Sequence, residues 1–246
     1  MAPAGYGDKV EGIHAVLAAA RAGRVNRLYV DRGRKDRPDV TGVIDLVGRE
    51  RVQIVDDVRT RASTDAPQGV VAECRPLSAL SLDALKETTD AVLVLDHIED
   101  PHNVGAVARS ARAAGVGGLV VSSRRAAPLS AAAFKAAAGT LEQLPVAVVS
   151  SIPDALRRLK DLGFWVVGLE ATAEQALFGL DLLTEPVAVV IGAEGQGMAR
   201  LTTLNCDVLV SIPMAPGNES LNASVSAALA AFEIMRVRNA SRGRHT

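Results

Sequence analysis

Polar side chains that could do chemistry gather in three short segments of this 246-residue sequence, and each segment follows a Val-rich run. They begin near Asp96, Ile191 and Ser211 and read DHIEDPHNVGAVARS, IGAEGQG and SIPMAPGNESLNAS. Their carboxylate, amide, hydroxyl and guanidinium groups can position a substrate through hydrogen bonds. In parallel sheets ligands bind at the carboxyl ends of the strands, so the three segments predict one site.

The first segment places Asp96, His97, Asp100 and His102 close together in sequence, which resembles a metal-binding group. A tight loop of turn-forming residues before a helix produces the same letters, however, and no other His or Cys lies near in sequence to complete a site. We therefore predict no metal and interpret both histidines as local hydrogen-bonding residues.

A predicted helix follows this loop and carries one amide and two guanidinium groups. Asn103 lies at the predicted helix start, where an Asn side chain can cap free backbone N–H groups. Arg109 and Arg112 are three residues apart and can share one face of the helix. An isolated arginine at such a position is usually a surface residue, so these side chains alone identify no reaction.

The second segment is a glycine loop between a hydrophobic strand and a helix. Gly192, Gly195 and Gly197 permit positive φ angles and a close approach of a ligand to the backbone. The spacing GxxGxG differs from the dinucleotide fingerprint GxGxxG, and no Lys-Ser/Thr pair follows to make a phosphate-binding P-loop. Glu194 within the loop is either a partner of the first turn of the helix or a functional group.

The third segment joins a strand to a long apolar helix. It contains Ser220, Asn222 and Ser224 after a loop with two prolines and a glycine. Ser220 could be no more than the N-cap of the helix. A serine-hydrolase site needs a base and an orienting acid, but the sequence has no GxSxG elbow and its histidines are remote. This alternative is therefore disfavoured.

Strands and helices alternate from residue 91 onward, and these elements must position the three segments. Near-continuous Val-rich strands joined by helices predict an α/β fold with a parallel sheet that is buried on both faces. The predicted strands cover residues 91–98, 118–123, 146–150, 164–170, 187–192 and 207–213, and the predicted helices cover 103–115, 129–139, 152–163, 197–204 and 221–238.

The preceding part of the chain predicts a small α/β unit over residues 1–75. Its predicted helices cover 12–23 and 38–48, and its predicted strands cover 27–30, 51–55 and 69–74. Residues 76–90 lack strong periodicity and are predicted to join this unit to a larger domain over residues 91–246.

One stretch of the small unit is strongly basic. Residues 21–37 hold seven basic side chains against two acidic ones, a charge pattern expected for contacts with nucleic-acid phosphates. A merely solvated charged face is the alternative interpretation. The seven candidate RNA-binding residues are Arg21, Arg24, Arg27, Arg32, Arg34, Lys35 and Arg37.

Composition excludes several other classes of protein. With 27 basic and 28 acidic residues the chain has no global attraction to nucleic acid, and only 3% aromatic residues disfavour a sheet that stacks RNA bases. Cys74 and Cys206 form no CxxC pair, which disfavours a disulfide scaffold or a zinc site. The sequence shows no membrane-length apolar run and no signal-peptide core, so we expect a cytoplasmic protein.

Taken together and in order, the three segments resemble the motifs of the SpoU (TrmH-like) family of SPOUT methyltransferases. The matching motifs are N-x-G-A-x-x-R-S at 103–110, I-G-A-E-G-x-G at 191–197, and S-I-P-M followed by S-L-N-x-S at 211–224. The resemblance covers about residues 91–238. Residues 1–75 resemble, less closely, the L30e-type RNA-binding domain of the branch that modifies a guanosine of large-subunit ribosomal RNA.

This resemblance implies a carboxyl-terminal trefoil knot, a homodimer through the knot domain, and methylation of a ribose 2′-hydroxyl in RNA with S-adenosyl-L-methionine as the methyl donor. The implied catalytic residues are Asn103, Arg109, Glu194, Ser220, Asn222 and Ser224. The implied cofactor-binding residues are Gly192, Gly197, Ile212, Met214 and Leu221. Because a guanidinium stays protonated, we expect Arg109 to orient the hydroxyl and a phosphate, and the identity of the base stays open.

The expected substrate is ribosomal RNA, with a guanosine favoured. The alternatives are a transfer RNA ribose, a different ribosomal nucleotide as in resistance methyltransferases, and a non-catalytic RNA-binding assembly protein. The presence of the motif residues disfavours the last of these. The residues APGNE at 215–219 depart from the commonest family pattern, which leaves base specificity less defined than reaction type.

Overall fold

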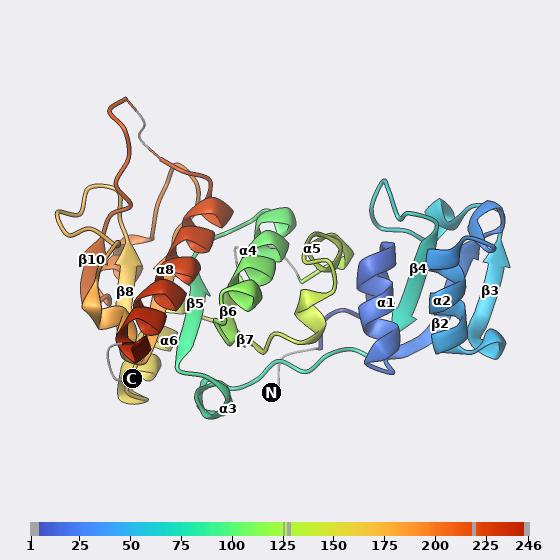
Figure 1. Cartoon of the computed structure of the whole chain (residues 1–246), viewed down its shortest axis with the longest axis horizontal. Coiled ribbons are helices and arrows are strands. Elements are labelled where there is room, and N and C mark those ends of the chain that lie inside the picture. Colours follow the sequence, from blue (N-terminus) through green and yellow to red (C-terminus); the bar gives the residue numbers. More distant parts are fainter. Residues whose placement is uncertain (1–4, 125, 127–128, 218–219, 244–246) are drawn as a thin grey trace.

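Two β-sheets lie side by side along the long axis of the chain (Figure 1). The computed structural model describes residues 5–124, 126, 129–217 and 220–243. The first sheet has four strands in the order β1-β4-β2-β3, with β2 and β3 parallel and the other pairs antiparallel. Its elements are β1 (Lys9–Glu11), α1 (Ile13–Arg21), β2 (Val25–Asp31), α2 (Pro38–Val47), β3 (Val52–Val55) and β4 (Val70–Cys74).

The second sheet has six strands in the order β10-β8-β9-β5-β6-β7, and every pair is parallel, as the sequence predicts. Its strands are β5 (Ala91–Leu95), β6 (Gly118–Ser122), β7 (Val146–Val149), β8 (Trp165–Leu169), β9 (Val187–Ile191) and β10 (Val208–Val210). Its helices are α3 (Leu82–Thr88), α4 (Pro101–Ala113), α5 (Ala131–Ala136), α6 (Ile152–Asp161), α7 (Arg200–Thr203) and α8 (Ala223–Gly243). Short 3-10 turns at Thr140–Glu142 (η4) and Asp181–Thr184 (η5) belong to the same half.

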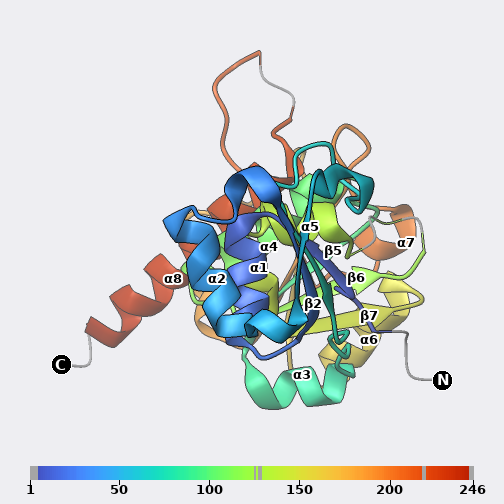
Figure 2. The same ribbon diagram turned by 90° about the vertical axis from the view of Figure 1, so that its right-hand side faces the viewer.

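Helices cover both faces of the parallel sheet because its strands are apolar on both faces. Leu93 and Leu95 of β5 pack in the cluster that includes α4 and α8, whereas Val92 and Val94 pack in the cluster that includes α3 and α6. Figure 2 shows α4 and α8 on one side of the molecule and α6 and α7 on the other. In the part of the chain that the structure describes, no helix is long and apolar enough to span a membrane.

Residues 76–90 form more structure than the predicted joint. Ser81 accepts a hydrogen bond from the backbone N–H of Ala84 and so caps α3. Leu85 of this helix is fully buried against the parallel sheet, and Leu80 forms a β-bridge with Ala147 of β7. The strand β1, which was not predicted, is only three residues long and owes its place to pairing with β4.

The two halves of the chain share one apolar cluster rather than having separate cores. Phe134 of α5 is fully buried in this cluster, and a Cβ atom placed on Gly7 would lie 2.4 Å from its ring. A Cβ atom on Gly139 would likewise lie 2.5 Å from the Cβ of Ala18 in α1. Backbone therefore packs directly against the opposite half, which fixes how the two halves sit.

A buried ion pair crosses the same boundary. Arg24 Nε donates to Glu142 Oε2 at 2.7 Å, and a second guanidinium nitrogen contacts the other carboxylate oxygen. The side chains are only 4% and 1% exposed. Burial is the largest single influence on the pKa of Arg24 and would lower it, but the hydrogen bond to Glu142 and the attraction of nearby acidic groups together hold the pKa above its ordinary value. Arg24 is therefore charged inside the interface.

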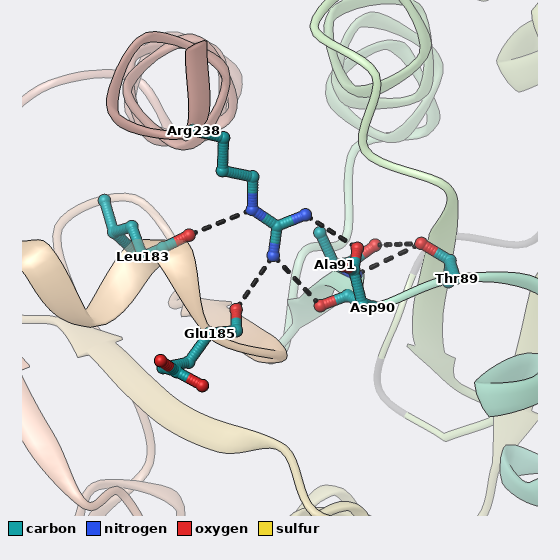
Figure 3. Close-up of polar contacts among 6 residues, drawn as sticks. All are labelled: Thr89, Asp90, Ala91, Leu183, Glu185 and Arg238. Atoms are coloured by element: carbon teal, nitrogen blue, oxygen red, sulfur yellow. Dashed lines mark hydrogen bonds and ion pairs between the residues drawn. The ribbon is translucent and has the colours of Figure 1, made fainter. Parts of the chain in front are cut away.

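Arg238 attaches α8 to the amino ends of the two central strands of the parallel sheet (Figure 3). Its guanidinium donates to the carbonyl oxygens of Leu183 at 3.0 Å, Glu185 at 2.8 Å and Asp90 at 3.3 Å, and to the Asp90 carboxylate at 2.6 Å. Thr89 fixes the same turn through hydrogen bonds with the backbone of Ala91. One side chain thus joins the segments that precede β5 and β9 to the last helix.

Replacing Arg238 with Met should lower the free energy of unfolding by about 2 kcal/mol, because carbonyl groups lose a charged donor. Urea unfolding monitored by circular dichroism measures the effect. Arg242→Met is the matched control, since Arg242 is exposed on the same helix. Equal stability of the two variants would contradict the role of Arg238.

Candidate active site and cofactor cavity

A cavity of about 230 Å³ lies where β8 and β9 end and α8 begins. The five predicted cofactor-binding residues all line it: Gly192, Gly197, Ile212, Met214 and Leu221. Two predicted catalytic residues, Glu194 and Ser220, line it as well. The second and third segments of the sequence thus meet at one edge of the parallel sheet, as its topology requires.

Two of the three glycines in the loop after β9 show why the loop requires glycine. A Cβ atom on Gly192 would lie 2.1 Å from the carbonyl carbon of Gly197, so no side chain fits there. Gly197 has a φ of 66°, which favours glycine. The loop closes on itself through Ala193, whose N–H donates to the Gly197 oxygen at 3.0 Å and whose oxygen accepts from the Gly197 N–H at 2.8 Å. Its backbone therefore forms one wall of the cavity.

Glu194 and Asn222 connect the glycine loop to α8. Asn222 Nδ2 donates to Glu194 Oε2 at 3.1 Å. The Asn222 Oδ1 atom accepts from the backbone N–H of Ser224 at 2.9 Å and from its hydroxyl at 2.6 Å. Asn222 is therefore the side chain that caps α8, and Ser220 is not the N-cap. Glu194 thus contacts the cap of α8 rather than the first turn of the helix after the glycine loop, and its role as a functional group on the cavity wall stays a prediction.

Asp96, at the end of β5, holds the far end of the glycine loop. Its carboxylate is fully buried, and Oδ2 accepts from the backbone N–H of Ala199 at 2.8 Å. Its Oδ1 atom lies 2.6 Å from His97 Nδ1, so this histidine has the local hydrogen-bonding role that we predicted. Among the described residues no group of three or more His, Cys, Asp or Glu side chains could hold a metal ion.

The first segment contributes α4, which packs beside α8. Asp100 accepts from the backbone N–H of His102 at 2.8 Å and caps the helix, so the prediction of Asn103 as the cap is wrong. Asn103 lies half-buried in the first turn, and Arg109 is exposed two turns further on. Neither residue lines the cavity, nor does Ser224, which contacts Asn222 instead.

The basic stretch is exposed at six of its seven predicted RNA-binding positions. These are Arg21, Arg27, Arg32, Arg34, Lys35 and Arg37. Arg24 is the exception: its side chain is buried against Glu142, so assigning it to RNA binding is wrong. A buried guanidinium cannot contact an RNA phosphate.

Sequence reasoning missed one wall of the cavity. Leu169, Glu170 and Ala171 line it from the end of β8. The available signal was their position, since they lie at the carboxyl end of a predicted strand of the same parallel sheet. Asn218 and Glu219 of the APGNE stretch lie outside the described residues.

Both cysteines are free thiols. Burial raises the pKa of Cys74 to about 12, and it raises the pKa of Cys206 to about 12 as well. Each thiol is therefore protonated near neutral pH and is a poor nucleophile. Covalent chemistry at these two side chains is disfavoured.

An all-parallel sheet with a glycine-walled cavity at its carboxyl edge, preceded by a smaller mixed sheet, defines an α/β protein built to bind a small ligand between strand ends. The family model described as "SpoU rRNA Methylase family" matches residues 90–232. The model described as "RNA 2'-O ribose methyltransferase substrate binding" matches residues 9–80. The chain belongs to the SpoU rRNA methylase family.

Related proteins are similar to this chain over nearly its whole length. The chain is 40% identical to the 23S rRNA (guanosine-2'-O-)-methyltransferase RlmB of Ralstonia nicotianae, covering 93% of this chain and 95% of that protein. It is 39% identical to the putative TrmH family tRNA/rRNA methyltransferase YacO of Bacillus subtilis, covering 94% and 96%. Among solved structures, the SpoU methyltransferase AviRb of Streptomyces viridochromogenes in complex with AdoMet superposes with a TM-score of 0.79 at 27% identity, covering 94% and 90%.

Proposed function

We propose that this protein transfers the methyl group of S-adenosylmethionine to the ribose 2′-hydroxyl of a guanosine in 23S ribosomal RNA. The observation that carries the proposal is the cavity, which brings Gly192, Glu194, Ser220 and Leu221 together at the carboxyl edge of the sheet. Relatives named as RlmB favour 23S rRNA guanosine, and neighbours solved with AdoMet favour this cofactor.

The cavity fits a nucleoside cofactor. Ile212, Met214 and Leu221 offer apolar surface for a base, and the glycine loop presents backbone groups in a conformation that a side chain at Gly192 would disrupt by clashing with Gly197. Apolar walls with a few placed polar groups are typical of such sites. When bound, S-adenosylmethionine supplies an electrophilic methyl group on a sulfonium.

The residues of the chain would act by positioning. Methyl transfer needs the attacking oxygen in line with the methyl group, and holding that geometry supplies much of the acceleration. Ser220 on the cavity wall and Asn222 beside Glu194 can hydrogen-bond a ribose. A guanidinium is a poor proton acceptor, so we assign Arg109 the orientation of the hydroxyl and of the neighbouring phosphate. Arg109 does not line the cavity of its own chain, and the proposal has it reach the site across or along the dimer interface.

The proposal includes a trefoil knot in the larger half and a homodimer formed through that half, acting in the cytoplasm where ribosomal RNA is found. The supporting observation is on α8, where Val225 and Phe232 are 45% and 44% exposed. Large apolar side chains exposed along a helix are typical of interaction surfaces. Sedimentation of the purified chain tests this part of the proposal.

The deciding experiment is transfer of labelled methyl groups from S-adenosylmethionine to unmodified 23S rRNA and, in parallel, to transfer RNA, followed by mapping of the 2′-O-methylated nucleotide. One modified guanosine in 23S rRNA is the expected result. A modified transfer RNA ribose, or a different ribosomal nucleotide, would overturn the substrate. Cofactor binding without transfer to either RNA would favour a non-catalytic assembly role.

Asn222 offers a test of the link between the glycine loop and α8. Asn222→Ala should lower the free energy of unfolding by about 1 kcal/mol, through the lost cap, and weaken cofactor binding. Asn222→Asp keeps the cap but places a second carboxylate beside Glu194, so it should restore stability without restoring affinity. Calorimetric titration and urea unfolding separate the two effects.

Asn205→Ala is the control, since the Asn205 side chain donates a hydrogen bond to the Leu201 carbonyl outside the cavity. Restored affinity in Asn222→Asp would show that the contact with Glu194 is unimportant.

A further inference from the structure

A second groove lies between the two halves of the chain, away from the cofactor cavity. It has a volume of about 450 Å³, and its walls come from α1, from α4 and from the turn at 138–143. Figure 1 shows α1 standing beside the helices of the larger half. We call it the interdomain groove, and the residues that matter in it are His14, Arg21, Arg112, Ala138, Gly139 and Glu142.

The groove is lined by cations from both halves. His14, Ala18 and Arg21 follow one another at helical spacing and present one face of α1 to it. Arg112 of α4 faces the same groove from the larger half. Both arginines are exposed, and neither guanidinium has a hydrogen-bond or ion-pair partner among the described residues.

The acidic residue of the groove does not neutralise them. Glu142 contributes to the wall, but both of its carboxylate oxygens contact the guanidinium of Arg24 on the buried side. Its side chain is 1% exposed. The groove therefore offers uncompensated positive charge to an anion, while the ion pair behind it holds its two walls together.

The turn at 138–143, which lines the groove, has a strained backbone conformation. Ala138 has a φ of 50° and Gly139 a φ of 88°, and a non-glycine residue at such an angle costs about 1 kcal/mol or more. Gly139 packs so closely on Ala18 that the halves cannot slide at this point. A groove with a fixed backbone has no backbone ordering cost on binding, so only its two exposed arginine side chains have to be ordered.

The groove is next to a residue that we assign to catalysis. Arg112 lies three residues after Arg109 on α4, a spacing that places the two Cβ atoms about 5–6 Å apart. An RNA strand whose target ribose is oriented by Arg109 carries its next phosphates within reach of Arg112. From Arg112 the groove continues to Arg21 on the other half.

We propose that the interdomain groove binds backbone phosphates of the RNA strand beside the methylated nucleotide, with Arg21 and Arg112 as the contacts. This inference rests on the proposed function for the identity of the polyanion. In this proposal the larger half contacts the RNA backbone directly, through Arg112. Phosphate contacts carry no sequence information, so the groove would set the register of the strand rather than choose the base.

The test compares Arg21→Gln, Arg112→Gln and the double variant with the unaltered chain in binding to unmodified, transcribed 23S rRNA over a series of salt concentrations. The double variant should bind about tenfold more weakly, and the slope of log affinity against log salt should fall by about 1.4, or about 0.7 for each lost single-strand contact. Arg112→Lys should keep most of the slope, because lysine retains the charge.

Arg157→Gln is the matched control, since Arg157 is an exposed arginine on α6, across the sheet from α4. Its affinity and salt slope should match those of the unaltered chain, and cofactor affinity and urea midpoints should be the same in all variants. An unchanged salt slope in the double variant, or an equal loss in the control, would overturn the inference. Methyl transfer by the unaltered chain tests the proposed function separately, so failure of either one can be recognised.

Discussion

Alanine at Arg109 is expected to lower the rate of methyl transfer by about 100- to 1,000-fold, the usual effect of removing one positioned donor from a transition state. Cofactor affinity should stay within a few-fold, because Arg109 does not line the cavity. Single-turnover transfer to 23S rRNA and calorimetric titration with S-adenosylmethionine measure the two quantities. A large loss of both would indicate a folding defect instead.

The Arg109→Lys variant separates the effect of the positive charge on the transfer rate from the effect of the planar guanidinium. Lysine keeps the charge but lacks the planar fork that contacts two oxygen atoms at once. Partial recovery of the rate in Arg109→Lys is therefore expected, with the transfer rate between those of alanine and arginine. Full activity in Arg109→Ala would remove this residue from the mechanism.

Alanine at Glu142 should lower the free energy of unfolding by about 3–5 kcal/mol, because Arg24 is left charged and unpaired inside the interface. Replacing both partners, as in Arg24→Met with Glu142→Leu, should recover much of this loss, since no buried charge then remains. Urea unfolding of the single and double variants measures the difference.

Glu99→Ala provides the comparison for this experiment. Glu99 is exposed in the loop before α4, and its removal should change stability by less than about 0.5 kcal/mol. A loss below about 1 kcal/mol in Glu142→Ala would show that water reaches the ion pair. The interface would then be looser than its packing indicates.

The elements of the larger half could be predicted because buried parallel strands are apolar on both faces. Runs such as VLVL in β5 and VAVVI in β9 therefore appear as uninterrupted apolar letters. The short strand β1 carries no such pattern, since its place depends on pairing with β4. Leu85 in α3 was overlooked for a similar reason, because one buried side chain produces no periodicity.

The residues that line the cavity could be predicted because their motifs are specific, whereas the contacts of individual charged side chains could not. The local sequence around Arg24 is basic, as it is around its exposed neighbours, and only the tertiary contact with Glu142 distinguishes it. The choice between Ser220 and Asn222 as the cap of α8 likewise depends on where the helix starts, which sequence places only approximately.

The shared core changes how the smaller half can be tested. Deleting residues 1–75 would uncover Phe134 and leave Glu142 without its cation. A truncated chain that fails to bind RNA would therefore report on folding as much as on recognition. Point substitutions at exposed arginines avoid this difficulty.

The cavity draws its walls from the ends of β8 and β9 and from the first turn of α8, a helix whose attachment by Arg238 lies near the end of the described chain. Synthesis proceeds from the amino terminus, so the wall from α8 leaves the ribosome after the walls from β8 and β9. A nascent chain therefore has no complete ligand pocket until the first turn of α8 has been made. A premature stop codon before α8 should then yield an inactive protein rather than a partly active one.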